Sequence, residues 1–228
     1  MLEADRTPPT TMQTPSDTTY DVGHSMPLRA VFLDRDGTLI ANKHYLSNPD
    51  DIVVLPGVRE ALARLQTEGV KLFLFTNQSG VGRGLFTMAD VEAVNRRMVE
   101  MLQLGAELFA GICIAPESPQ ETPVYRKPSP RFIHEMLASH SIAASTAWMV
   151  GDSPVDWEAG RNAGIQTAAI VLDPSLMMSP GLSVARSAVA SPLATSPEAI
   201  ANRREELGVA SYPSLLAWLD CVQKRTNE

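Results

Sequence analysis

The sequence predicts an α/β fold in which a parallel sheet carries helices on both faces. Short apolar runs recur along the chain, and segments with the spacing of amphipathic helices separate them. The runs cover residues 29–33, 70–75, 111–115, 147–150 and 167–172. Strands that alternate with helices pair in parallel, and ligands then bind beyond the carboxyl ends of the strands. We therefore expect a functional site after the first, second and fourth runs.

One folded domain accounts for the length and composition of the chain. The 228 residues, 44% of them hydrophobic, suffice for one full α/β core. Residues 1–26 are rich in Thr, Pro, Ser and Asp and lack apolar periodicity, which is typical of a disordered tail. We expect residues 27–228 to form a single domain.

The first elements follow in order after this tail. The run 29–33 ends directly before Asp34 and is typical of a buried parallel strand. Helical patterns at residues 58–67 and 88–104 precede the second and third strands. After the fifth run, residues 173–208 contain several prolines among many Ser and Ala residues. We expect a flexible insertion there.

Two further helices are predicted near the end of the chain. Residues 197–207 have a helical pattern, and Ser196 precedes them as a plausible N-cap. Within residues 212–222, apolar side chains such as Leu215 and Trp218 recur at helical spacing. This pattern predicts a closing helix that packs on the core, and a helix that binds a partner is the alternative.

Composition argues against several classes of protein. The net charge of -7 opposes a nucleic-acid-binding surface, because such surfaces neutralise phosphates with basic residues. Cys113 and Cys221 are too few for a disulfide framework, and the four histidines form no metal-ligand pattern with them. No run approaches the length of a membrane helix, and the polar N-terminus lacks a signal sequence. We expect a cytoplasmic monomer that binds neither membranes nor nucleic acid.

Two carboxylates follow the first strand in the motif DRDGT, residues 34–38. Asp34 and Asp36 can converge on one reaction centre if the chain turns there, and Gly37 permits such a turn. One carboxylate can accept a phosphoryl group while the other acts as general acid and base. A surface turn is the alternative, since Asp and Gly are common turn residues.

Two further motifs supply groups that can hold phosphate. The second strand leads into TNQSGVGRG at residues 76–84, where a hydroxyl and backbone N–H groups can donate to phosphoryl oxygens. Arg126 and Lys127 precede a helical segment and can bind an anion together with the positive helix end. A glycine-rich connecting loop and a solvated pair of cations are the respective alternatives.

The fourth strand leads into GDSPVD at residues 151–156. A carboxylate at Asp152 could face Asp34 and complete an oxygen-ligand site for magnesium. Asp156 could also bind the metal, or it could cap the helix that starts near Pro154.

Together these motifs resemble the haloacid dehalogenase superfamily of phosphohydrolases, from about residue 28 to residue 172. The strings TNQSGVGRG and RKP narrow the resemblance to the branch of D-glycero-D-manno-heptose 1,7-bisphosphate phosphatases and histidinol-phosphate phosphatases. The resemblance implies a Rossmann-like sheet. Many relatives have a large cap domain, but here residues 38–70 and 76–127 are accounted for by a flap and core helices, which leaves no room for one. Short loops would then select the substrate, with His44 and Tyr45 or the late insertion as candidates.

The resemblance also implies roles for individual residues. Asp34 would be the nucleophile and Asp36 the general acid, and Thr76 and Lys127 would stabilise the transferring phosphoryl group. The expected substrate contacts are Gly37, Thr38, Asn77, Gln78, Arg126 and His44. The expected Mg²⁺ ligands are the side chains of Asp34 and Asp152 and the backbone carbonyl of Asp36, with Asp156 in support or as a direct ligand.

One departure from the branch concerns a structural zinc ion. Many members carry Cys and His ligands in a pattern like CPHHP, followed by CxC immediately before RKP. Here the corresponding residues 115–119 read APESP, and residues 123–125 read PVY. We expect no structural zinc, so packing without metal must order this loop.

The expected function is hydrolysis of a small phosphorylated metabolite. The resemblance favours D-glycero-D-manno-heptose 1,7-bisphosphate as the substrate, with loss of the 7-phosphate. Histidinol phosphate or another sugar phosphate is an alternative substrate. A 3'-phosphatase acting on nucleic-acid ends is opposed by the acidic composition, and a non-catalytic phosphate- or partner-binding protein is the alternative outside enzymes.

Overall fold

The computed structural model describes residues 27–43, 45–172 and 196–227. The predicted N-terminal tail, His44 and most of the predicted insertion lie outside the described residues. All structural statements below concern the described part of the chain.

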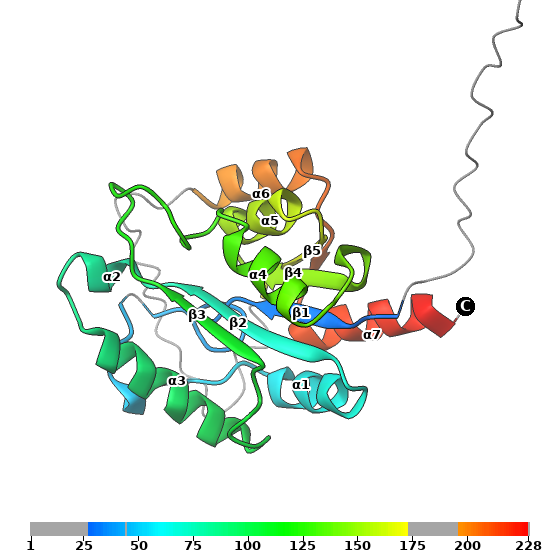
Figure 1. Cartoon of the computed structure of the whole chain (residues 1–228), viewed down its shortest axis with the longest axis horizontal. Coiled ribbons are helices and arrows are strands. Elements are labelled where there is room, and N and C mark those ends of the chain that lie inside the picture. Colours follow the sequence, from blue (N-terminus) through cyan, green and yellow to red (C-terminus); the bar gives the residue numbers. More distant parts are fainter. Residues whose placement is uncertain (1–26, 44, 173–195, 228) are drawn as a thin grey trace, which may run out of the picture.

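A six-stranded parallel sheet forms the centre of the described structure, with the strand order β3-β2-β1-β4-β5-β6 (Figure 1). The strands are β1 Ala30–Leu33, β2 Lys71–Asn77, β3 Gly111–Ala115, β4 Ala147–Gly151, β5 Gln166–Ile170 and β6 Ser211–Tyr212. β1 lies between β2 and β4, so the carboxyl ends of these three strands are neighbours. The predicted parallel sheet is confirmed.

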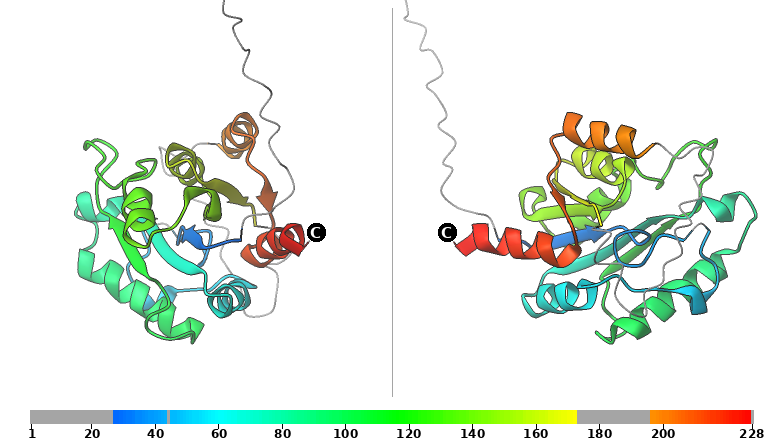
Figure 2. Two further views of the ribbon diagram at one scale, coloured as in Figure 1. Left: turned by 45° about the vertical axis from the view of Figure 1, so that its right-hand side comes forward. Right: turned by 180° about the vertical axis from the view of Figure 1, so that it is seen from behind.

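Helices cover both faces of the sheet, as predicted. They are α1 Val58–Thr67, α2 Ser79–Gly82, α3 Met88–Leu102, α4 Arg131–Ser139, α5 Pro154–Asn162, α6 Pro197–Glu206 and α7 Leu215–Asn227, with 3₁₀ helices η1 Pro49–Asp51 and η2 Ala144–Thr146. α1, α3 and α7 pack on one face, and α4 and α5 pack on the other (Figure 2). α1 and α3 thus cover the sheet rather than form a separate cap over its edge.

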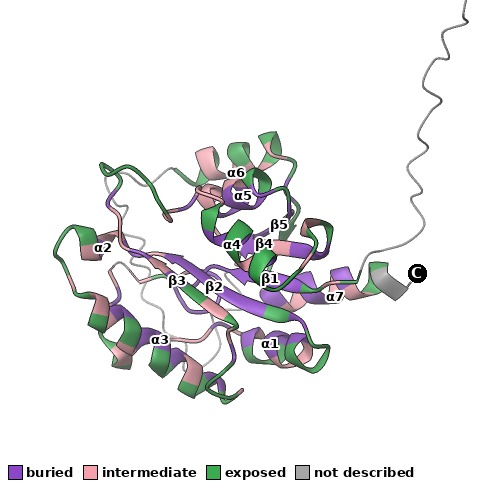
Figure 3. Ribbon diagram, viewed as in Figure 1, coloured by how far each residue is buried: buried purple, intermediate pink, exposed green. Residues whose placement is uncertain are grey.

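The alternation of side chains along β1 explains the two layers. Val31 and Leu33 point into the cluster beneath α1, α3 and α7, whereas Ala30 and Phe32 point into the cluster beneath α4 and α5. All four side chains are fully buried, because a central parallel strand is covered on both faces. Figure 3 shows the buried residues concentrated in the central strands and on the inner sides of the helices.

The end of the chain returns to the sheet. As predicted, the closing helix α7 packs on the core, where Trp218 is fully buried with its ring centroid 5.7 Å from that of Trp148. The helix predicted at residues 197–207 is present as α6, and the Ser196 hydroxyl caps it by accepting the Ala199 N–H. The following strand β6 pairs with β5 and was not predicted from the sequence, because it has only two residues.

Residues 196–208 of the predicted insertion are therefore structured, and α6 packs against α5. Arg203 of α6 donates to Glu158 of α5 at 2.8 Å. The described helices include none that is both long and apolar enough to cross a membrane.

Candidate active site

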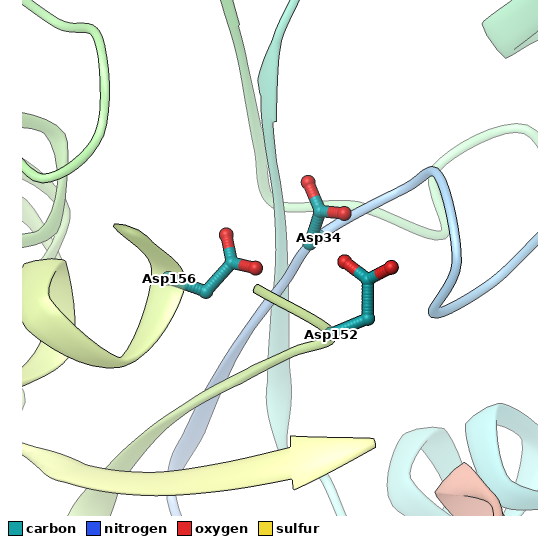
Figure 4. Close-up of side chains that lie close together, drawn as sticks. All are labelled: Asp34, Asp152 and Asp156. Carbon is teal, nitrogen blue, oxygen red and sulfur yellow. The ribbon is translucent and has the colours of Figure 1, made fainter. Parts of the chain in front are cut away.

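Three carboxylates gather at the carboxyl edge of the sheet. Asp34 directly follows β1, Asp152 directly follows β4, and Asp156 lies in the first turn of α5. Each can offer an oxygen atom such that the three oxygens lie within 4.8 Å of one another. Figure 4 shows the three carboxyl groups around a common space. The site thus forms where the parallel topology predicts it.

Lys127 provides the positive charge at this cluster. Its Nζ atom lies 2.5 Å from Asp34 Oδ1 and 2.5 Å from Asp156 Oδ1, and it donates to the Phe75 carbonyl oxygen at 2.8 Å. Only 2% of the Lys127 side chain is exposed. Burial alone would lower the pKa of Lys127, but the charges of Asp156 and Asp34 outweigh burial and raise it. Lys127 therefore stays charged beside the predicted nucleophile. We call Asp34, Lys127, Asp152 and Asp156 the carboxylate–lysine centre.

The carboxylates of this centre exceed its single cation. Burial raises the pKa of Asp34 to about 7, although the charge of Lys127 acts in the opposite direction. Burial, and then the charge of Asp34, also raises the pKa of Asp152 well above its ordinary value. Crowded carboxylates with raised pKa values are typical of a site that binds a divalent cation. The oxygen donors present fit Mg²⁺, which prefers carboxylate ligands.

Two glycines allow the carboxylates to approach the backbone. Gly37 has a φ of +90°, and a Cβ atom there would lie 1.9 Å from Asp152 Oδ2. A Cβ atom at Gly151 would lie 2.4 Å from the Asp156 carboxyl carbon. Any other residue at Gly37 would therefore displace Asp152, so this glycine builds the site rather than merely permitting a turn.

Asp156 both caps α5 and takes part in the carboxylate–lysine centre. Its Oδ2 atom accepts the Ser153 N–H at 3.0 Å and the Ser153 hydroxyl at 2.7 Å. Its Oδ1 atom faces Lys127, and the side chain is fully buried. The sequence left two roles open for Asp156, helix capping and metal binding. One carboxylate oxygen caps the helix, and the other faces the site.

Asp36 is held by its neighbour Arg35 and by Gln78 from the motif after the second apolar run. Arg35 Nε and Gln78 Nε2 each donate to Asp36 Oδ2 at 3.0 Å. Arg35 is itself buried and donates to Asn95 Oδ1 of α3 at 2.9 Å. Asp36 Oδ1 is buried and has no hydrogen-bond partner among the described residues. Asp36 thus keeps one oxygen free for proton transfer.

Sequence reasoning did not assign a role to Arg35 or Asn95. Arg35 stands between the two aspartates, so a buried cation there could have been suspected from the motif DRDGT. Asn95 lies 60 positions further along the chain, in the middle of a helix. No sequence signal points to it.

Residues at the end of β2 support Lys127 as well as the site. The Asn77 side chain accepts the Lys127 N–H at 2.9 Å and donates to the Lys127 carbonyl oxygen at 3.2 Å. Thr76 is buried, and its hydroxyl accepts a hydrogen bond from Gln78 at 2.8 Å. Thr38 is also buried, with its Oγ1 unpartnered among the described residues. The structure brings these predicted residues to one edge, and their contacts with substrate stay predictions.

A cavity of about 340 Å³ opens beside Asp36. Asn77, Gln78 and Arg126, which are among the predicted substrate contacts, line it. Its further lining includes polar residues without a predicted role, namely Asn42, Lys43, Ser79 and Arg83. Tyr45, a candidate from the sequence, lines it as well and accepts a hydrogen bond from Arg83 at 2.5 Å.

The cavity is strongly cationic. Arg35, Lys43, Arg83 and Arg126 line it, and Asp36 is the carboxylate among its described lining residues. Burial, and the nearby charge of Arg83, lower the pKa of Arg126. Two guanidinium groups that repel each other in one cavity favour an anion between them.

The comparison with protein families decides the relationship of the chain. The model of the family described as haloacid dehalogenase-like hydrolase matches residues 33–170. The chain belongs to this family. The matched range begins at the end of β1 and ends at β5, and it contains all the described residues of the predicted site.

Individual relatives and solved structures agree with this assignment. The D-glycero-beta-D-manno-heptose-1,7-bisphosphate 7-phosphatase of Helicobacter pylori strain 26695 is 36% identical over 146 residues, which is 63% of this chain and 84% of the relative. The enzyme of that name from Rhodopseudomonas palustris is 34% identical over 60% of this chain and 79% of its own length. The predicted enzyme class, a phosphatase of the haloacid dehalogenase-like family, is confirmed.

Two crystal structures support the same relationship. The D,D-heptose 1,7-bisphosphate phosphatase from B. bronchiseptica, complexed with magnesium and phosphate, has a TM-score of 0.65 and 25% identity, covering 86% of this chain and 99% of that one. The D,D-heptose 1,7-bisphosphate phosphatase from Burkholderia thailandensis has a TM-score of 0.53 and 26% identity, covering 86% and 98%. The predicted fold class is thereby confirmed.

Proposed function

We propose that this haloacid dehalogenase-like hydrolase removes the 7-phosphate from D-glycero-D-manno-heptose 1,7-bisphosphate through an aspartyl-phosphate on Asp34. The observation that carries the proposal is the carboxylate–lysine centre, with Lys127 Nζ 2.5 Å from Asp34 Oδ1. The names of the relatives favour the heptose substrate. The cationic cavity beside the centre supports a substrate with two phosphates.

The first half of the reaction transfers the phosphoryl group to the protein. An oxygen of Asp34 attacks the phosphorus atom, and the bond between phosphorus and the sugar oxygen breaks. Asp36 gives its proton to the leaving sugar oxygen. Lys127 holds the negative charge that develops on the phosphoryl oxygens, and Thr76 donates a further hydrogen bond.

The second half regenerates Asp34. A water molecule loses a proton to Asp36 and attacks the phosphorus atom of the aspartyl-phosphate, and the bond to Asp34 breaks. Inorganic phosphate leaves, and Asp36 has regained the proton that it gave to the sugar. The unpartnered Oδ1 of Asp36 suits both proton transfers.

Mg²⁺ fits this centre as a cofactor. Asp34 and Asp152 would hold it through their side chains, Asp36 through its backbone carbonyl, and Asp156 would support it. When bound, Mg²⁺ supplies charge that reduces the repulsion between the carboxylates and the phosphate. The excess of carboxylates over cations in the described centre supports this assignment.

The second phosphate of the substrate would lie in the cavity near Arg83 and Arg126. Arginine binds phosphate through paired N–H donors, so two guanidinium groups favour a phosphate over a neutral sugar end. Histidinol phosphate carries an imidazole ring at the end remote from its phosphate and has no second phosphate. It would leave Arg83 and Arg126 without an anionic partner, so the cavity favours a bisphosphate.

The test is phosphate release from the heptose 1,7-bisphosphate, histidinol phosphate and several sugar monophosphates, with Mg²⁺ or with EDTA. We expect the highest kcat/KM for the bisphosphate and loss of release in EDTA. Preference for histidinol phosphate would overturn the substrate, and release unaffected by EDTA would overturn the role of Mg²⁺. The variant Asp34→Asn tests the proposed nucleophile in the same assay. Asp50→Asn, which changes an exposed aspartate of η1, is its matched control.

The setting of this reaction is also part of the proposal. We place the enzyme in the cytoplasm, because Cys113 and Cys221 are free and suit a reducing compartment. We also propose that it is a monomer. Size-exclusion chromatography with light scattering tests the monomer, and a mass of twice the chain would overturn it.

A further inference from the structure

The segment between β3 and α4 brings Arg126 to the cavity without regular secondary structure of its own. We call residues 116–126 the Arg126 loop. Its two ends are joined by one side chain. Glu117 Oε1 accepts the backbone N–H groups of Val124, Tyr125 and Arg126 at 3.1, 2.8 and 3.3 Å. Arg126 Nη1 donates in return to the Glu117 carbonyl oxygen at 3.1 Å.

The Glu117 carboxylate is ionised in this arrangement. Burial alone would raise its pKa, but these three backbone N–H groups, together with the N–H of Glu117 itself, outweigh burial and hold the pKa of Glu117 below its ordinary value. An ionised acceptor makes stronger hydrogen bonds than a neutral one. Three successive N–H groups that converge on one anion also form a preferred anion-binding geometry of the backbone. The bonds therefore fix the backbone at Arg126 as well as its side chain.

The Arg126 loop also packs on the segment that carries Arg83. The Gly82 N–H donates to the Pro116 carbonyl oxygen at 3.1 Å, and a Cβ atom at Gly82 would lie only 2.6 Å from that oxygen. Glu117 thus stands one residue after the contact with Gly82 and bonds the backbone of Arg126. Glu117 belongs to the loop that carries Arg126 and adjoins the residue that contacts the segment of Arg83, and its negative charge favours the charged form of Arg126.

We propose that Glu117 is a positioning residue that sets Arg126 for the second phosphate of the substrate, and this rests on the proposed function. Lys127 has supports of its own, since Asn77 holds its backbone and Asp34 and Asp156 hold its side chain. Glu117 therefore governs recognition of the remote phosphate, while the chemistry at Asp34 is independent of it.

The test compares Glu117→Ala and Glu117→Gln with the wild type on two substrates. The heptose 1,7-bisphosphate needs the cavity, whereas p-nitrophenyl phosphate has no second phosphate. Loss of a charged acceptor should raise KM for the bisphosphate about tenfold in Glu117→Ala and leave kcat nearly unchanged. The kcat/KM for p-nitrophenyl phosphate should stay within about twofold of the wild type. Equal losses on both substrates would overturn the proposal.

Glu121→Gln is the matched control within the same loop. Glu121 accepts the Ser118 N–H at 2.6 Å but makes no hydrogen bond to residues 124–126 among the described contacts. A double variant with Arg126→Ala shows whether Glu117 acts through Arg126. In that case the losses on the bisphosphate are not additive, since Arg126→Ala has already removed the group that Glu117 positions. Additive losses would contradict the proposed route.

Amide hydrogen exchange separates this proposal from the proposed function. Glu117→Ala should speed exchange at the amides of residues 124–126, and Glu121→Gln should not. A wild type that does not prefer the bisphosphate would overturn the substrate but would leave this measurement valid. Unchanged exchange at the three amides would overturn the positioning role of Glu117 even if the bisphosphate is the substrate.

Discussion

The carboxylate–lysine centre and the Arg126 loop are neighbours that are built in different ways. The carboxylates of the centre stand at strand ends and a helix start. Lys127 follows the Arg126 loop, but its charge is buried among these carboxylates, with Lys127 2% exposed and Asp156 fully buried. The Arg126 loop is partly exposed and is held by three backbone N–H groups on Glu117. One region is ordered by the sheet, and the other is ordered by one carboxylate.

Under the proposed function, this difference separates catalysis from recognition. A reaction centre tolerates little displacement, so it benefits from rigid elements and buried ion pairs. Recognition of a remote phosphate can instead lie on a loop, where a change of sequence alters the substrate without disturbing the fold. We therefore expect changes in the centre to affect every substrate and changes around the loop to affect bisphosphates selectively.

The largest effect is expected from Asp34→Asn. The amide cannot form the aspartyl-phosphate, so turnover of every substrate should fall by roughly 10⁴-fold or more. Steady-state phosphate release measures this loss, and circular dichroism shows whether the fold is retained. Asp50→Asn should keep wild-type activity. A loss confined to the bisphosphate would contradict the division between the two regions.

Lys127→Met should affect both activity and stability. Removal of the cation leaves Asp34 and Asp156 buried without their partner, which typically costs about 3–5 kcal/mol of the free energy of unfolding. Turnover should fall on the order of 10²–10³-fold on all substrates, because Lys127 is the proposed stabiliser of the transferring phosphoryl group. Urea denaturation and phosphate release measure the two effects.

Lys71→Met is the control for Lys127→Met, because Lys71 is an exposed lysine at the start of β2. It should change neither activity nor stability appreciably. Wild-type stability in Lys127→Met would show that the buried ion pairs do not hold the centre together.

The pH dependence of stability tests the excess of carboxylates in the metal-free centre. Burial raises the folded-state pKa of Asp34 to about 7, so the folded protein holds a proton between about pH 4 and 7 that the unfolded chain has released. The free energy of unfolding in EDTA should therefore fall as pH rises through this window. Asp34→Asn should show a smaller fall, and Mg²⁺ should reduce the fall in the wild type. Equal pH dependence in the wild type and Asp34→Asn would contradict the assignment.

The centre was largely predictable from the sequence because two of its carboxylates directly follow strands. Asp34, Thr76 and Asp152 come at the ends of buried apolar runs, and the topology of a parallel sheet brings such ends together. Lys127 was predicted only from the motif RKP, and its contact with Asp156 had no sequence signal. The short strand β6 and the bond between Arg35 and Asn95 depend on tertiary packing, which local patterns do not contain.

The Arg126 loop was predictable only in part. The departure from the zinc pattern indicated that packing must order the loop, but nothing in APESP identifies Glu117 as an acceptor of N–H groups seven to nine residues later. Loop conformation depends on backbone angles and individual hydrogen bonds, whereas strands and helices depend on periodic patterns. Arg83 likewise stood in a recognised motif, and its place in the cavity became evident only from the structure.

The smallest effect is expected from Arg83→Ala, which tests the recognition side of the comparison. Arg83 lines the cavity and donates to Tyr45, but it makes no contact with the carboxylate–lysine centre among the described interactions. KM for the heptose 1,7-bisphosphate should rise by about three- to tenfold, since an exposed guanidinium gives up a phosphate contact that is partly screened by water. The kcat/KM for p-nitrophenyl phosphate should not change, and Arg97→Ala on the exposed side of α3 is the matched control. A comparable loss on p-nitrophenyl phosphate would mean that Arg83 acts on the transferring phosphoryl group. Arg83 would then belong to the catalytic region and not to the region that recognises the second phosphate.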